Sequence, residues 1–116
     1  MKVLTDESLN ESIKLCQENE RYRVLIVTKY IGDQKFILDY LSQTGADVIR
    51  CFGRPWARFL NGSSINIIST ASTIRGYKAD LVLYQAGVID GDDVMMSDLA
   101  AAEIANRNFK LFKDEV

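Results

Sequence analysis

The amino-acid sequence predicts a single α/β domain over residues 1–116, in which a mainly parallel sheet is covered by helices on both faces. Two apolar runs, RVLIVT (Arg23 to Thr28) and ADLVLY (Ala79 to Tyr84), have the continuous aliphatic composition of strands buried on both sides. Segments with helical periodicity precede, separate and follow these runs. Strands that alternate with helices are typical of a three-layer α/β arrangement, and the chain length suits one such domain.

Composition excludes several classes of function. With 47% apolar and 26% charged residues, the sequence is that of an ordinary globular protein, and its net charge of −2 provides no overall basic field for nucleic acid. The chain has no histidine, so the usual neutral-pH general base is missing. Short apolar runs and the absence of a signal-peptide core predict a cytoplasmic protein that does not enter the membrane. Cys16 and Cys51 are expected to be reduced and to lie in the core.

Helices are expected in three places. The first spans Ser8 to Asn19, because Ser8 and Glu11 have the spacing of a capping box. An alanine-rich helix is expected from about Ser97 to Asn106. Between them, a helix should begin at Asp33 as N-cap and end before Gly45. Its predicted buried stripe consists of Phe36, Ile37, Tyr40 and Leu41.

The segment between Gly53 and Ser69 allows two interpretations. Asn61-Gly62 is a strong hairpin signal, which would pair WARFL with SINIIS as antiparallel strands. A short helix from Pro55 to Gly62 is the alternative. The strand-like run of SINIIS favours the hairpin. DVIRCF, from residue 47 to 52, and FKLF, from residue 109 to 112, are read as a further strand and an edge strand.

The order of these segments resembles a known family. FLNGSSINIIS followed by IRGYKADLVLY is similar to the P-loop ATPase domain of large terminase subunits, which package DNA into viral heads. The matching positions are Asn61, Gly62, Ser63, Ile65, Arg75, Gly76, Asp80 and the strand Leu81 to Leu83. The same segment also resembles the second motor domain of superfamily 2 helicases, through RVLIVT, Gly53, Thr70, Arg75 and Gly76. Both resemblances imply a RecA-like fold.

The chain departs from both families where chemistry would occur. No segment before the first helix has the glycines and lysine of a phosphate-binding loop, since TDESLNES contains neither. On the simplest alignment, Gln85 and Ala86 replace the metal-holding Asp and the catalytic Glu of the terminases. Thr70 and Ser72 would lie beside these positions. Because phosphoryl transfer depends on metal and electrostatic positioning, we expect no ATP hydrolysis and no cofactor.

Two basic-aromatic groups are candidates for binding DNA or a protein partner. Arginines and lysines beside an aromatic ring can hold phosphates and stack on bases. The first group is Arg75, Tyr77 and Lys78, and the second is Arg54, Trp56 and Arg58 together with Arg50. Solvated turn cations and a tryptophan packed into the core are the alternative interpretation. If both groups share a face, a local basic patch exists despite the net charge.

A third cluster, Asp90, Asp92 and Asp93, could hold a hard cation through carboxylate oxygens. It lacks the pattern of a calcium loop, because Met95 stands where the glycine is needed. An acidic helix N-terminus, favoured by the helix dipole, is the preferred interpretation of this cluster. No metal site is therefore predicted.

The sequence thus predicts a non-catalytic, terminase-like or helicase-like domain of phage or prophage origin. It would bind DNA or a protein of a packaging or DNA-processing machine. Two enzymatic alternatives stay open: a composite ATPase to which the chain lends Arg75, and a magnesium-dependent hydrolase that uses Asp80 or the Asp90 cluster. Self-association through a sheet edge is the remaining alternative.

Overall fold

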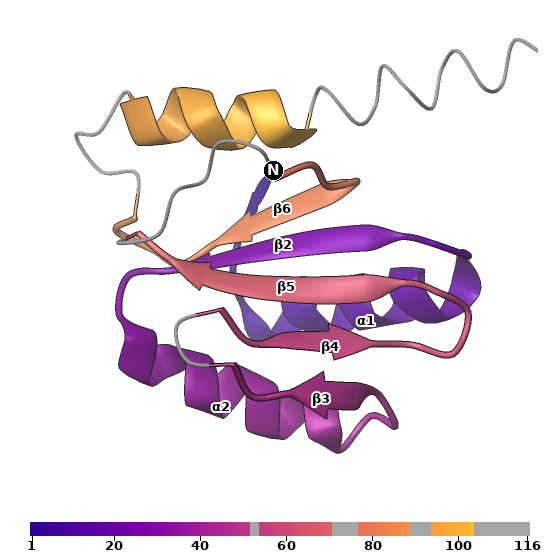
Figure 1. Ribbon diagram of the computed structural model, residues 1–116. Coiled ribbons are helices and arrows are strands. Elements are labelled where there is room, and N and C mark those ends of the chain that lie inside the picture. The colour runs from indigo at the N-terminus through magenta and orange to yellow at the C-terminus, as the bar shows by residue number, and fades with distance from the viewer. Residues whose placement is uncertain (52–53, 71–76, 89–93, 104–116) are drawn as a thin grey trace, which may run out of the picture.

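The computed structural model describes residues 1–51, 54–70, 77–88 and 94–103 (Figure 1). In chain order, the elements are β1 (Lys2–Val3), α1 (Asp6–Glu18), β2 (Arg23–Thr28), α2 (Ile31–Ser42), β3 (Asp47–Ile49), β4 (Trp56–Arg58), β5 (Ser64–Ser69) and β6 (Leu81–Tyr84). Residues 94–103 form a further helix. The six strands form one sheet in the order β1-β6-β2-β5-β4-β3.

The sheet is mixed. β1, β6, β2 and β5 run parallel to one another, whereas β4 is antiparallel to both β5 and β3. The antiparallel pairing of β4 with β5 confirms the predicted hairpin around Asn61-Gly62, and Gly62 has the positive φ of 87° that such a turn requires. The predicted α/β class is therefore confirmed, with a mixed six-stranded sheet and three helices in the described residues.

Strand side chains alternate between two core clusters, one on each face of the sheet. Val24, Ile26, Ile65 and Ile67 pack against α1 and α2. On the other face, the cluster contains Leu25, Val27, Ile68, Val82 and, from helix 94–103, Leu99. Figure 1 shows α1 and α2 on one side of the sheet and helix 94–103 on the other.

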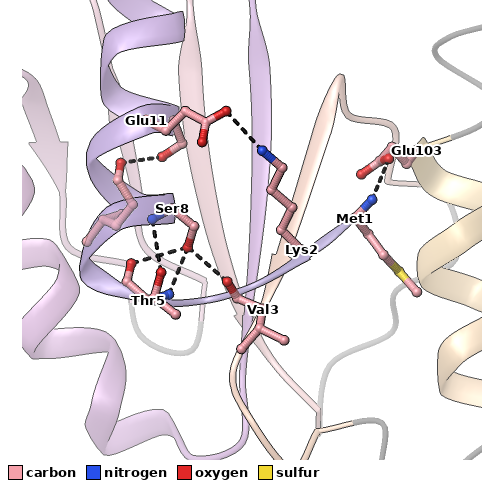
Figure 2. A network of polar contacts seen from close by, with 9 residues as sticks. Met1, Lys2, Val3, Thr5, Ser8, Glu11 and Glu103 are labelled. Atoms are coloured by element: carbon pink, nitrogen blue, oxygen red, sulfur yellow. Dashed lines mark hydrogen bonds and ion pairs between the residues drawn. The ribbon is translucent and has the colours of Figure 1, made fainter.

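Helix α1 begins two residues before the predicted start. Thr5 is the N-cap, and its hydroxyl accepts a 3.0 Å hydrogen bond from the Ser8 backbone N–H, while the Ser8 hydroxyl accepts one of 2.7 Å from the Thr5 N–H (Figure 2). The prediction of Ser8 as N-cap is therefore wrong, because Ser8 closes the capping box from inside the helix. Glu11 instead forms an ion pair with Lys2 at 2.9 Å.

Helix α2 also begins earlier than predicted, with Tyr30 at the N-cap and Asp33 inside its first turn. The predicted buried stripe is half wrong: Ile37 is 9% exposed and Leu41 fully buried, but Phe36 is 74% and Tyr40 40% exposed. The helix is rotated so that its buried face is completed by Gln34 and Leu38. Sequence periodicity favoured the wrong stripe, because Phe36 and Tyr40 are more apolar than Gln34, which the helix nevertheless buries.

Other boundaries differ by a few residues. β3 ends at Ile49, because Arg50 turns to the helical side and pairs with Asp39 of α2 at 2.8 Å. The two-residue β1 was not predicted. The last helix is already helical at residue 94, before the expected Ser97. Its predicted end and the FKLF segment lie outside the described residues.

Helix 94–103 is linked to the sheet by the buried carboxylate of Glu103, the last residue of the helix that the structure describes. Glu103 lies 2.6 Å from the Met1 ammonium (Figure 2). Its other carboxylate oxygen accepts a 2.8 Å hydrogen bond from the Val82 N–H. β1 pairs with β6 at Leu83 and Tyr84, and Val82 lies before this pairing begins. The Val82 N–H therefore has no acceptor in β1 and donates to Glu103 instead.

The hairpin turn is fastened to the end of α1. The Asn61 side-chain amide donates to the carbonyls of Cys16 at 2.7 Å and Asn19 at 3.2 Å, and its oxygen accepts from the Ser63 N–H at 3.0 Å. The Ser63 hydroxyl donates to the Asn19 carbonyl at 2.5 Å and accepts from the Tyr22 N–H at 2.9 Å. These bonds satisfy carbonyls that the helix end leaves open.

Replacing Asn61→Ala should therefore lower the free energy of unfolding by about 1–3 kcal/mol, because the part-buried Cys16 carbonyl and Ser63 N–H lose their partner. Urea denaturation followed by circular dichroism measures the loss. Leu60→Ser, in the same turn but fully exposed, is the matched control and should change stability by less than about 0.5 kcal/mol. Equal effects of the two substitutions would contradict this role of Asn61.

Candidate functional site

The carboxyl ends of β2, β5 and β6 meet at one edge of the sheet, where ligands of open α/β sheets usually bind. Thr28, Thr70 and Gln85 lie at this carboxyl edge, as the sequence predicted for the last two. Helix α2 also begins here, directly after β2. Ser72 lies outside the described residues.

Both polar ends of the Gln85 side chain form hydrogen bonds that link elements at this edge. Its side-chain oxygen accepts a 2.7 Å hydrogen bond from the Lys29 N–H, and its amide nitrogen donates to Asp33 Oδ2 at 3.0 Å. Its backbone N–H donates to the Val27 carbonyl at 2.9 Å. Gln85, which was predicted to align with the terminase metal ligand, thus connects the end of β6 to the β2–α2 junction. Ala86, at the next position, is exposed.

The hydroxyl groups of the carboxyl edge are mostly engaged as well. Thr28 Oγ1 donates to the Tyr30 carbonyl at 3.0 Å, and Thr70 Oγ1 lies 3.4 Å from the Lys29 carbonyl oxygen. Among the described residues, the Ser69 hydroxyl is the buried side-chain oxygen without a hydrogen-bond partner. No group of three or more histidine, cysteine or acidic side chains that could hold a metal ion occurs in the described part of the chain.

Several residues that carry the family resemblance lie at the opposite edge of the sheet. Asn61 and Ser63 fasten the hairpin to α1, as described above. Asp80 precedes β6 and accepts a 3.0 Å hydrogen bond from the Arg23 N–H through its carboxylate, while its own N–H donates to the Arg23 carbonyl at 2.8 Å. The structural roles of these three residues account for the motif without any ligand.

The two cysteines have different environments. Cys16 is fully buried, and burial together with the nearby charge of Asp80 raises the pKa of its thiol to about 12. The same two causes raise the pKa of Tyr22 to about 12. The prediction of a core position is confirmed for Cys16 and wrong for Cys51, which is exposed. Neither thiol is in a disulfide.

At pH 8, a thiol-specific reagent such as 5,5′-dithiobis(2-nitrobenzoate) should therefore modify Cys51 and spare Cys16, which holds no thiolate at that pH. One thiol should react in the native protein and both in 6 M guanidinium chloride. Rapid reaction of both thiols in the native state would contradict the burial of Cys16.

The members of the predicted basic-aromatic group around Trp56 lie on both sides of the sheet. Ala57 packs into the core beneath α1 and α2, so Trp56 and Arg58 project from the other face. The Arg58 guanidinium stacks 4.8 Å from the centre of the Trp56 ring and lies 3.8 Å from Asp47. Arg54 is exposed just before the strand. Arg50 is separated from this group, because it pairs with Asp39 on the helical side.

The part of the sheet face around Trp56 is less buried than the part that helix 94–103 covers. Ile49, Trp56 and Asn66 are paired across β3, β4 and β5, and all three are only half-buried. On the same face, Leu25 and Val82, which continue the row on β2 and β6, are buried in the second core cluster. Among the described residues, the face of β3, β4 and the adjoining half of β5 is thus uncovered; we name it the open face.

The other predicted candidates are only partly described. Tyr77 is half-buried against the second core cluster, and Lys78 is exposed. Arg75, Asp90, Asp92 and Asp93 lie outside the described residues. The open face could have been anticipated only in part, since a lone Trp in the sequence does not reveal which side of a strand it occupies.

Comparisons of the chain with protein-family models, with curated proteins and with solved structures each find no match. The terminase-like and helicase-like resemblances therefore stay predictions. No helix in the described residues is both long and apolar enough to cross a membrane.

The role of Gln85 can be tested by Gln85→Glu, which keeps the shape of the side chain but removes its donor. The introduced carboxylate would face Asp33 Oδ2, so stability at pH 7 should fall by about 1–3 kcal/mol. Part of the loss should be recovered near pH 5, where a protonated carboxyl can again donate. Urea denaturation at both pH values measures this change.

Ala86→Glu is the matched control, because it adds the same charge at the exposed neighbouring position. It should change stability by less than about 0.5 kcal/mol at either pH. Similar behaviour of both variants would contradict the bridging role of Gln85.

Proposed function

We propose that this chain is a non-catalytic domain with the frame of a nucleotide-hydrolysing motor, and that it binds a single strand of nucleic acid on the open face. A RecA-like relationship, terminase-like or helicase-like ancestry, a phage or prophage origin and a cytoplasmic location are parts of this proposal. Its biological setting would be a DNA-packaging or DNA-processing machine.

The observation that carries the proposal is the Trp56–Arg58 pair on the open face. A base can stack on a partly exposed indole, and such stacking contributes about 1–3 kcal/mol per base whatever the base. Ile49 and Asn66 flank the ring on the neighbouring strands and offer apolar contact and an amide for hydrogen bonding. The arrangement matches the sequence-tolerant way in which sheet faces hold single strands.

Charge on the open face supports phosphate binding of modest strength. Both partners of the Arg58–Asp47 contact are exposed, at 56% and 75%, so this 3.8 Å pair contributes little and Arg58 can turn to a phosphate. Arg54 adds a second exposed cation nearby, before β4. Because the whole chain carries a net charge of −2, we expect weak binding that weakens further with added salt.

Gln85 and Ala86, at the carboxyl edge, support the proposal that the chain is not catalytic. Gln85 uses its amide for bonds to Lys29 and Asp33, and a neutral amide cannot replace a carboxylate at a divalent ion. Ala86 has no group that could activate water. Binding without turnover is therefore the function that these residues favour.

Binding of oligo(dT) should quench the fluorescence of Trp56, the single tryptophan of the chain. In fluorescence anisotropy with a labelled oligonucleotide, Trp56→Ala should weaken binding about 5- to 100-fold, because one stacking contact is lost. Arg58→Ala should weaken it less and reduce the salt dependence by about one phosphate contact.

Arg50→Ala is the matched control, since Arg50 follows β3 but turns to the helical side, and it should bind like the unmodified chain. Unchanged tryptophan fluorescence and anisotropy at low salt would refute the proposal. Loss of binding in Arg50→Ala without loss in Arg58→Ala would place the contact on the wrong face.

A further inference from the structure

A groove of about 400 Å³ lies between the first two turns of α1 and the middle of α2. It is on the helical side of the sheet, so the open face and the groove are on opposite sides of the molecule. Its lining residues are Asp6, Leu9, Asn10, Phe36, Ile37 and Tyr40.

The groove has apolar and aromatic walls that are open to solvent. Phe36 is 74% and Tyr40 40% exposed, whereas Leu9 and Ile37, at 8% and 9%, form the buried floor. The Tyr40 hydroxyl donates a hydrogen bond to Asn10 Oδ1, which fixes this wall against α1. An aromatic ring as exposed as Phe36, beside a preformed hollow, is typical of a surface that a partner covers.

The charge of the groove comes from one carboxylate. Asp6 is the sole charged residue of the lining, and Glu7 follows it in the first turn of α1. The ion pairs within the described residues involve Glu11, Glu18, Asp39, Asp47 and Glu103, and none involves Asp6. An acidic group next to aromatic walls complements a cation on an apolar stem and disfavours nucleic acid.

We propose that this groove docks a basic amphipathic segment of a protein partner. An apolar side chain of the partner lies between Phe36 and Tyr40, and a neighbouring lysine or arginine pairs with Asp6. Recognition of this kind uses an apolar face for contact area and a charge for orientation. The proposal does not depend on the open face, and together the two surfaces would let one domain hold a strand and a protein at the same time.

The test uses the ¹⁵N-labelled chain and a ten-residue amidated peptide with leucines and lysines at helical spacing. The matched probe replaces every lysine with glutamate. Backbone amides of residues 6–10 and 36–40 should shift with the basic peptide and not with the acidic one. Phe36→Ser and Asp6→Asn should each weaken binding at least fivefold.

Two control variants test whether the loss of binding is specific to residues that line the groove. Tyr30→Ser alters another exposed aromatic, at 62%, and Glu7→Gln alters the carboxylate next to Asp6, but neither residue lines the groove. Both should bind the basic peptide like the unmodified chain. All four variants should stay folded, although Tyr30→Ser, at the N-cap of α2, and Asp6→Asn, in the first turn of α1, should each change the free energy of unfolding by up to about 1 kcal/mol. Because the altered side chains are exposed, loss of folding does not obscure the result.

The proposal is overturned if the acidic peptide binds as well as the basic one, or if the shifts lie away from the groove. It is also overturned if Phe36→Ser and Asp6→Asn leave binding unchanged. Self-association of the unmodified chain in light scattering that disappears in Phe36→Ser would assign the groove to a second copy instead.

Discussion

The reversal of the chain at Asn61 and Gly62 is the constraint on which the rest of the structure depends. It places β4 antiparallel beside β5 and extends the sheet beyond the strands under helix 94–103. The turn is held by side-chain bonds from Asn61 and Ser63 to the end of α1, so its position relative to the sheet is fixed. Because the hairpin makes residues 56–58 a strand of this sheet, Trp56 and Arg58, which are two positions apart, lie on the same face, the open face.

A second constraint acts at the carboxyl edge of the parallel strands. In an α/β sheet this is the usual place for a ligand, and helix α2 begins there. Gln85 instead fills the position with hydrogen bonds to Lys29 and Asp33, and the threonine hydroxyls contact backbone carbonyls. The neutral amide of Gln85 thus gives this edge a structural role, because it bridges the end of β6 and the β2–α2 junction.

The sequence predicted the strands and the hairpin well, because their signals are local. RVLIVT is a short apolar run rich in β-branched residues, which favours a fully buried strand, and Asn-Gly favours a turn conformation that few other pairs adopt. The rotation of α2 could not be predicted, since it buries the polar Gln34 and exposes the more apolar Phe36, against the local hydrophobic pattern. The exposure of Phe36 and Tyr40, and with it the groove, follows from how α2 packs on the sheet.

The candidate site was predicted in composition but not in arrangement. Trp56, Arg58 and Arg50 are close in sequence, yet the pleat of neighbouring strands sends Arg50 to the opposite face. The motif residues Asn61 and Asp80 indicated a family and proved to satisfy backbone groups of the fold. Their hydrogen-bond partners are distant in sequence, so no local pattern could reveal that role.

The most direct test of the central claim is a nuclear magnetic resonance titration of the ¹⁵N-labelled chain with unlabelled oligo(dT) at low salt. If the open face is the binding surface, the Trp56 indole N–H and the amides of β3, β4 and the first half of β5 shift together, while Lys29 to Asp33 stay unchanged. Shifts confined to Lys29, Asp33 and Gln85 would contradict the account, because they would place the ligand at the carboxyl edge that Gln85 closes.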